Sequence, residues 1–243
     1  MCGRYVLING KKVFATFAVL KHLQDTGQHF EDLPRYNASP MQEMPVIAIR
    51  EGSIIAQKMQ WWLIPHWSKD GKIAATTFNA KSETLEESKL FAPYFKSSRC
   101  LVPVDGFYEW KKTIVTKEVK GKEKQIIEKQ PMCIRMKDEQ TFMFAGLFSV
   151  WKNARGEEFP SFTIITTEPN ELMSDIHNRM PVILPEKHFE QWLDRENRDI
   201  PSLKKLLIPH LTTKMKAYRV SSYVSNSRNE GEECMKPIRD TKN

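Results

Sequence analysis

The chain has 243 residues, of which 40% are hydrophobic and 28% are charged, a balance typical of globular proteins with a substantial core. Its net charge of +7 favours polyanionic partners such as nucleic acid, although the same excess also serves solubility. The longest mainly apolar stretch, residues 141–151, is far shorter than the ~20 residues of a membrane span, and no secretory signal opens the chain. We therefore expect a cytoplasmic protein that does not bind membranes.

The four cysteines are widely separated, at Cys2, Cys100, Cys133 and Cys234. They form no CxxC pair, which argues against a disulfide framework and favours a reducing compartment. The same spacing argues against a structural zinc site. We expect no metal and no cofactor.

In chain order, residues 12–23 have the apolar spacing of a helix. Residues 45–50 and 54–60 are predicted to be strands joined by a tight turn. Ser82 can cap a helix running to about Phe91, before Pro93.

Strand-like runs follow at residues 100–104, 107–111, 132–136, 141–149, 159–167 and 216–221, and helices are predicted at 169–175, 186–193 and 200–207. This order shows no regular alternation of strand and helix. It therefore indicates an α+β fold with a mainly antiparallel, barrel-like β core and flanking helices. We expect a single domain over residues 1–243 that acts as a monomer.

Two segments differ in composition from the rest. Residues 111–130 form a lysine-rich insert, and the pattern predicts a protruding hairpin or loop that is either simply solvated or able to touch phosphates. Residues 222–243 form a polar C-terminal tail whose last residues are expected to be disordered.

The N-terminus has unusual chemical potential, because the chain begins Met1-Cys2. If Met1 is removed, Cys2 carries a free amine and a thiol on adjacent carbons. The amine can condense with an aldehyde to an imine, and the thiol can close onto the imine carbon to give a thiazolidine. Alternatively, the amine can serve as base for its own thiol, as in N-terminal nucleophile hydrolases. A processed terminus with an idle cysteine is the simplest alternative.

Three internal residues are candidates for acid–base or orienting roles. Glu109 lies in an aromatic setting and would share a strand face with Phe107; such surroundings raise a carboxyl pKa, although an exposed strand carboxylate is the alternative. His177 precedes a rigid turn and could shuttle protons or be purely structural. Asn79 could orient an amine or an oxyanion, but asparagines more often cap loops.

Basic and aromatic residues near these candidates suggest contacts to nucleic acid. Arg4, Lys81 and Arg179 each lie beside a candidate catalytic residue and are candidates for phosphate contacts. Residues 61–67 contain three tryptophans, which would stack on bases if exposed and belong to the core if buried.

Over nearly its whole length, the chain resembles the SOS response-associated peptidase (SRAP) family. The resemblance rests on the order and spacing of MCGRY, RYNASP, WWLIPHW, FNAKSET, VPVDGFYEW, FAGLFSVW, TIITTEPN and IHNRMPVIL, with Cys234 before Pro237. It implies removal of the initiator methionine, binding of single-stranded DNA, and a thiazolidine crosslink between the N-terminal cysteine and the aldehyde of an abasic site. This crosslink would protect the site during the DNA damage (SOS) response, on the nucleoid when the protein is bound to DNA.

The resemblance also assigns roles to residues. It implies that the catalytic set is Cys2, Asn79, Glu109 and His177, and that the DNA-binding residues are Arg4, Asn37, Pro40, Trp67, Lys81 and Arg179. Two positions depart from the family pattern: Lys81 replaces the usual arginine and loses its bidentate fork, and Trp62 replaces the usual glycine.

Two other functions stay open from sequence. One is an N-terminal-nucleophile amidohydrolase or glutaminase, because such enzymes also begin Met-Cys-Gly. The other is a non-covalent module that binds single-stranded nucleic acid through its basic surface and tryptophans.

Overall fold

The computed structural model describes residues 2–10, 34–72, 76–119 and 122–238, together with Val13, Phe17 and Leu20. Most of the predicted helix at 12–23 lies outside the described residues.

Thirteen strands are present in the described part of the chain: β1 (Tyr5–Leu7), β2 (Arg35–Ala38), β3 (Glu43–Arg50), β4 (Ser53–Trp61), β5 (Asn79–Lys81), β6 (Arg99–Val104), β7 (Gly106–Val119), β8 (Lys122–Met136), β9 (Phe142–Lys152), β10 (Glu158–Thr167), β11 (Met180–Pro181), β12 (Ile183–Leu184) and β13 (Met215–Arg219). The described α-helices are all short: α2 (Ala92–Ser97), α3 (Glu171–Ser174), α4 (Phe189–Leu193) and α5 (Ile200–Lys204). Short 3₁₀ helices lie at Ser82–Thr84, Glu186–His188, Thr212–Lys214, Ser222–Ser225 and Glu232–Cys234.

Five strands close into a barrel. Strand β4 pairs with β3, β3 with β6, β6 with β9, and β9 with β10, all antiparallel. Strand β10 then pairs with β4 in parallel, at Ser161 opposite Gln60, which completes the ring. The prediction of an α+β fold with a mainly antiparallel, barrel-like core is confirmed.

The barrel is filled by large apolar side chains. Trp61 is fully buried and stacks on Phe162, with ring centroids 6.3 Å apart. Its indole N–H donates to the carbonyl oxygen of Phe78 at 2.8 Å, so the one polar atom of the ring is satisfied. Because Phe78 directly precedes β5, this bond helps to fix the strand that carries Asn79.

A second sheet, in the order β13-β8-β7-β1-β2, lies beside the barrel. Alternation along β7 gives it two covered faces. Phe107 belongs to the main core, whereas Tyr108 packs in a second cluster with Val224 and Cys234 of the C-terminal segment. Glu109 is 3% exposed and, by the same alternation, lies on the Phe107 side.

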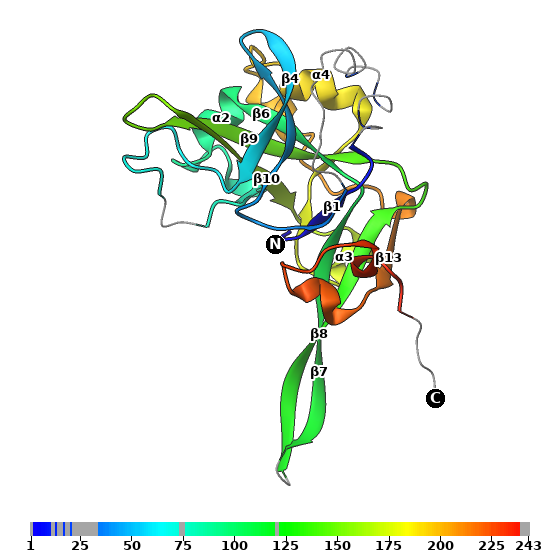
Figure 1. The fold of residues 1–243 in the computed structure, drawn as a ribbon. Coiled ribbons are helices and arrows are strands. Elements are labelled where there is room, and N and C mark those ends of the chain that lie inside the picture. The colour runs from blue at the N-terminus through cyan, green and yellow to red at the C-terminus, as the bar shows by residue number, and fades with distance from the viewer. Residues whose placement is uncertain are drawn as a thin grey trace.

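Strands β7 and β8 continue beyond this sheet as a long hairpin. Figure 1 shows its outer part projecting away from the rest of the molecule, with the orange and red C-terminal segment packed at its base. The lysine-rich residues predicted as an insert form this projection.

The helix predicted from Ser82 to Phe91 is wrong. Ser82 is buried and opens a single 3₁₀ turn that ends at Thr84, and the α-helix begins only at Ala92. Pro93 lies in the first turn of α2, where its missing N–H removes no helical hydrogen bond. The proline therefore starts a helix here instead of stopping one.

The polar segment after Ser221 packs on the second sheet up to its last described residues. Val224 and Cys234 are fully buried, and Val220 pairs with Pro237 in an isolated bridge. Residues 239–243, where disorder was predicted, lie outside the described part. None of the described helices is long and apolar enough to cross a bilayer.

Candidate active site

Cys2 lies at the junction of the two sheets. It lies three residues before Tyr5, the first residue of the short β1, and Tyr5 pairs with Phe107 of β7 and with Ala38 of β2. The Cys2 side chain is fully buried, and its sulfur lies 3.9 Å from the carbonyl oxygen of Arg4. Burial raises the pKa of the thiol, and the nearby Glu109 carboxylate raises it further.

Asn79 holds the Cys2 backbone from the barrel side. Strand β5 runs parallel to β10, with Asn79 opposite Ile164, and the Asn79 side-chain amide donates to the Cys2 carbonyl oxygen at 2.7 Å. Its side-chain oxygen is buried and has no hydrogen-bond partner among the described residues. Asn79 therefore donates to the Cys2 carbonyl oxygen while its own side-chain oxygen can accept a hydrogen bond from another group.

Glu109 is a buried carboxyl group on β7. Burial raises its pKa from the ordinary 4.5 to about 8. At neutral pH the group is therefore mostly protonated and can donate a proton. Because β1 pairs with β7 at Tyr5 and Phe107, the strands that follow Cys2 and carry Glu109 are neighbours.

His177 follows α3 and faces Glu109, with its Nε2 atom 4.0 Å from Oε2 of the carboxyl group. The backbone N–H of Arg179 donates to Nδ1 at 3.1 Å, closer than the 3.3 Å between Nδ1 and the Arg179 carbonyl oxygen. Nδ1 is therefore the acceptor, and the neutral ring carries its proton on Nε2, toward Glu109. Burial lowers the His177 pKa, which favours this neutral form.

The structure thus brings together the four residues predicted as catalytic. Cys2 precedes β1, and Asn79 lies on β5. Glu109 lies on β7, and His177 lies in the loop after α3. Among the described residues, no three His, Cys, Asp or Glu side chains are arranged to hold a metal ion.

Arg179 is clamped beside this cluster. Its guanidinium makes two bonds to Glu83, at 2.6 and 2.9 Å, and a third to the Thr166 carbonyl oxygen at 2.6 Å. The Arg179 bonds lower the pKa of Glu83. Sequence reasoning missed Glu83, although it lies two residues after Lys81 in the same motif.

Arg4 and Asn37 fasten the C-terminal segment. Arg4 donates to the carbonyl oxygen of Val224 at 2.9 Å and to the Asn37 side chain at 3.2 Å, and its guanidinium lies 5.9 Å from the centre of the Trp110 ring. The Asn37 amide donates to three carbonyl oxygens of that segment, at Val224, Asn226 and Asn229. These two predicted DNA-binding residues therefore hold the C-terminal segment in place.

The other predicted DNA-binding residues lie at the surface. Trp67 is 57% exposed, Lys81 is exposed, and Pro40 is half-buried in the turn after β2. Trp62, at the position that departs from the family pattern, is half-buried with its ring 5.4 Å from that of Phe78. Trp62 therefore packs against the residue that directly precedes β5, the strand that carries Asn79.

Comparison with known proteins identifies the family of this chain. The model of the "SOS response associated peptidase (SRAP)" family matches residues 1–227. The chain belongs to the SRAP family.

This SRAP chain is similar to two relatives that are both named abasic site processing proteins. It is 37% identical over 236 residues to the abasic site processing protein YoqW of Bacillus subtilis, covering 97% of this chain and 99% of the relative. It is 32% identical over 231 residues to the abasic site processing protein HMCES of Rattus norvegicus, covering 84% of this chain and 65% of the relative.

The solved structures support the fold of this SRAP chain. A crystal structure of a protein from Bacteroides thetaiotaomicron superposes with a TM-score of 0.77 at 27% identity, covering 98% of this chain and all of the other. A phage-related protein from Bordetella bronchiseptica superposes with a TM-score of 0.68 at 25% identity, covering 90% and 94%.

Proposed function

We propose that this protein processes abasic sites in DNA by binding single-stranded DNA and forming a thiazolidine between Cys2 and the aldehyde of the abasic sugar. The names of its relatives support the substrate class. The observation that carries the chemistry is the placement of Cys2, the second residue of the chain, in a cluster with the buried Glu109 and Asn79 and the half-buried His177. We propose that the protein acts as a monomer during the DNA damage response. Its location would be the cytoplasm, at the nucleoid when it is bound to DNA.

The first step is hydrolysis of the Met1–Cys2 amide, which consumes one water and releases methionine and the Cys2 amine. The buried carboxyl of Glu109 is suited to move a proton in this step. Asn79 orients the Cys2 backbone through its 2.7 Å bond to the Cys2 carbonyl.

The second step is condensation. His177 assists opening of the sugar ring by proton transfer, and the Cys2 amine attacks the freed C1′ aldehyde to give a carbinolamine. Glu109, protonated below a pKa of about 8, donates the proton with which the hydroxyl leaves as water. Loss of water leaves a protonated imine and the Glu109 carboxylate. The Cys2 sulfur then adds to the imine carbon, and its proton returns to Glu109. The net change is one C–N and one C–S bond formed and one water released.

DNA reaches the site along the surface residues. Lys81 provides an exposed positive charge for phosphates, and Arg179, whose charge is shared with Glu83, lies beside it as a second proposed contact. The exposed face of Trp67 provides a stacking surface for an unpaired base. Pro40, Arg4 and Asn37 are the other proposed DNA contacts, and Arg4 and Asn37 also hold the C-terminal segment.

The test is a crosslinking assay with untagged protein shown by mass to have lost Met1. It is mixed with a single-stranded oligonucleotide carrying one abasic site, and a heat-stable adduct is sought on a denaturing gel. Cys2→Ala, if processed, keeps the amine but loses the thiol. We expect it to give no heat-stable adduct and to cleave the strand through the imine by β-elimination, with the imine trapped by borohydride.

A heat-stable crosslink formed by Cys2→Ala without reductant would contradict the thiazolidine. Release of ammonia from glutamine without DNA would instead indicate an amidohydrolase. Unchanged DNA affinity in Cys2→Ala, with no covalent product from either protein, would indicate a non-covalent binding module.

A further inference from the structure

The connection between β4 and β5 joins the barrel core to the catalytic cluster and carries an exposed tryptophan. It begins after Trp61, which is fully buried, and ends at Asn79, which donates to the Cys2 carbonyl oxygen. Trp67 lies between them and is 57% exposed. Figure 1 shows this connection in cyan, beside the hairpin of β9 and β10. Under the proposed function, the Trp67 ring stacks on an unpaired base.

Trp67 lies in a hydrogen-bonded turn. The backbone N–H of Ser68 donates to the carbonyl oxygen of Pro65 at 2.9 Å, so His66 and Trp67 are the two central residues of the turn. The turn fixes the local backbone of Trp67. The direction in which it presents the ring depends on the contacts of the turn with other elements.

The side of the turn before Trp67 is held by Tyr94 of α2. The Tyr94 hydroxyl oxygen lies 2.9 Å from the backbone nitrogen of His66 and 2.8 Å from Nδ1 of the same residue. A hydroxyl group has one donor and two acceptor sites, so this one group satisfies both nitrogens. Tyr94 is only 4% exposed, and its ring meets that of His66 edge to face at 5.8 Å, so the hydroxyl is itself fixed in place.

The side of the turn after Trp67 is held by Trp151 of β9. The Trp151 indole N–H donates to the carbonyl oxygen of Ser68 at 2.6 Å. The same ring lies against Gly71, where a Cβ atom would come within 2.9 Å of two ring carbons. The residues directly before and after Trp67 are therefore each bonded to a side chain of another element, while the Trp67 ring itself stays exposed.

We propose that Tyr94 and Trp151 are positioning residues for DNA binding, which hold the turn so that the Trp67 ring is already placed to stack on a base. Ordering a loop during binding costs free energy, and a loop that is ordered in the free protein avoids that cost. The two bonds therefore raise the affinity for single-stranded DNA through Trp67. The role assigned to Tyr94 and Trp151 rests on the proposed function, because it takes the same DNA as the ligand.

The experiment is a double-mutant cycle on the affinity of full-length protein for an intact single-stranded oligonucleotide. Tyr94→Phe removes only the hydroxyl group, and it is made alone and together with Trp67→Ala. The matched control is Tyr108→Phe, alone and with Trp67→Ala, which removes one hydroxyl group from a 2.9 Å bond between β7 and β2 in the second sheet. Trp151→Phe tests the other side of the turn. Thermal unfolding verifies that each variant is folded.

Trp67→Ala is expected to weaken binding by about 5- to 150-fold, the range for the loss of one base stack. Tyr94→Phe and Trp151→Phe are each expected to weaken binding about threefold or more when Trp67 is present. Tyr94→Phe should have almost no further effect in the Trp67→Ala protein, because the group that it positions is then gone. Tyr108→Phe is expected to leave the affinity unchanged with and without the Trp67 ring.

Fluorine NMR of protein labelled with 5-fluorotryptophan reports on the turn without DNA. The chain has six tryptophans, and the Trp67 line is the one that is absent from Trp67→Phe. We expect a single narrow Trp67 line in the free wild type and in free Tyr108→Phe. The line should be broadened or doubled in free Tyr94→Phe, because the turn then samples more than one direction.

A wild-type protein that binds the strand would overturn the positioning role alone if Tyr94→Phe weakened binding equally with and without the Trp67 ring. An affinity that Tyr94→Phe or Trp67→Ala leaves unchanged, or an unchanged Trp67 line in Tyr94→Phe, would overturn it as well. Absence of any binding of single-stranded DNA by the wild type would contradict the proposed function, and the positioning role for DNA with it.

Discussion

Glu109 and His177 are both held without net charge at neutral pH, and for the same physical reason. Burial raises the pKa of the Glu109 carboxyl group and lowers that of the His177 imidazole. A neutral acid beside the Cys2 amine can give its proton to a leaving hydroxyl group, whereas an ionised carboxylate at the same place could not.

The pH dependence of crosslinking follows from these ionisations. The rate should rise as the Cys2 amine loses its proton, near the ordinary α-amine pKa of ~8. It should fall again as pH rises through about 8, because Glu109 then loses the proton it must donate. Glu109→Gln should slow the reaction by about 10²–10⁴-fold and remove the alkaline fall. Single-turnover rates between pH 6 and 10 measure both; an alkaline fall that persists in the variant would contradict this role for Glu109.

Glu83 is predicted to act through Arg179 on the position of His177. Its carboxylate holds the Arg179 side chain, while the Arg179 backbone N–H holds Nδ1 of the histidine. Glu83→Ala should reduce the single-turnover rate by several-fold, with a loss of unfolding free energy under about 1 kcal/mol, because Glu83 is half-exposed. Nitrogen NMR of the histidine ring should show a protonated Nε2 in the wild type and a mixed tautomer in the variant. An unchanged tautomer with a reduced rate would assign Glu83 to DNA contact instead.

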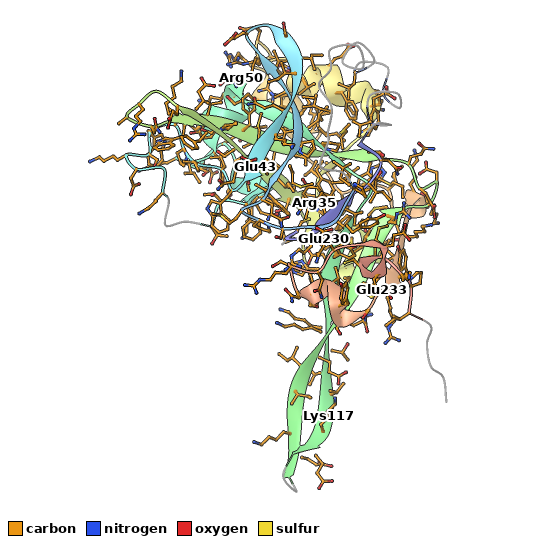
Figure 2. The ribbon with its side chains drawn as sticks, in the orientation of Figure 1. Arg35, Glu43, Arg50, Lys117, Glu230 and Glu233 are labelled. Carbon is orange, nitrogen blue, oxygen red and sulfur yellow. The ribbon has the colours of Figure 1, made fainter. Side chains whose placement is uncertain are left out.

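At the scale of elements, the C-terminal segment is anchored by residues of β2. Asn37 on β2 donates to three of its carbonyl oxygens, and Figure 2 shows Arg35 of the same strand beside Glu230, with which it forms an ion pair at 3.2 Å. Removing the donor would leave these carbonyls without the partner that holds them in place.

Asn37→Ala should therefore lower the free energy of unfolding by about 2–4 kcal/mol. Asn37→Asp has the same shape but replaces the donating amide by a carboxylate that faces three carbonyl oxygens, so it should cost at least as much. Urea unfolding measures both. A smaller cost for the aspartate variant would show that shape, and not hydrogen bonding, holds the segment.

The sequence predicted strands more reliably than helices. The runs at 45–50 and 54–60 are observed as β3 and β4 because their composition and the tight turn between them agree. The helix from Ser82 was wrong because capping signals are local, whereas this segment is fixed by the buried Ser82 and by pairing of β5 with β10. The polar composition of the C-terminal segment concealed its packing, because its burial depends on Val224, Cys234 and the partly buried Met235 among many polar neighbours.

Prediction of the site had a similar limit. Motifs and chemistry named Cys2, Asn79, Glu109 and His177, and they meet because a closed barrel and a second sheet share this junction. The distances between them depend on strand register, which composition does not specify. Glu83 was missed because an acidic residue after a turn is ordinary in sequence and gains its role only through Arg179.

At the scale of the whole molecule, barrel closure requires a glycine on β9. A Cβ atom at Gly146 would lie 2.9 Å from both the Cys100 sulfur and the Thr163 carbonyl oxygen, on the two neighbouring strands. Gly146→Ala should therefore destabilise the fold by about 1–3 kcal/mol. Gly156→Ala is the comparison, since no atom lies near its Cβ position and only its φ of 80° opposes the change, at a cost of about 1 kcal/mol. Urea unfolding that ranks Gly156→Ala as the more damaging change would contradict this packing argument.

The intact mass of the adduct between untagged protein and an abasic single-stranded oligonucleotide tests the central claim most directly, with peptide mapping of the modified residue. The account predicts a mass equal to the protein without Met1 plus the DNA minus one water, with the modification on the N-terminal Cys2. An adduct that retains Met1, or one attached to an internal lysine or cysteine, would contradict it.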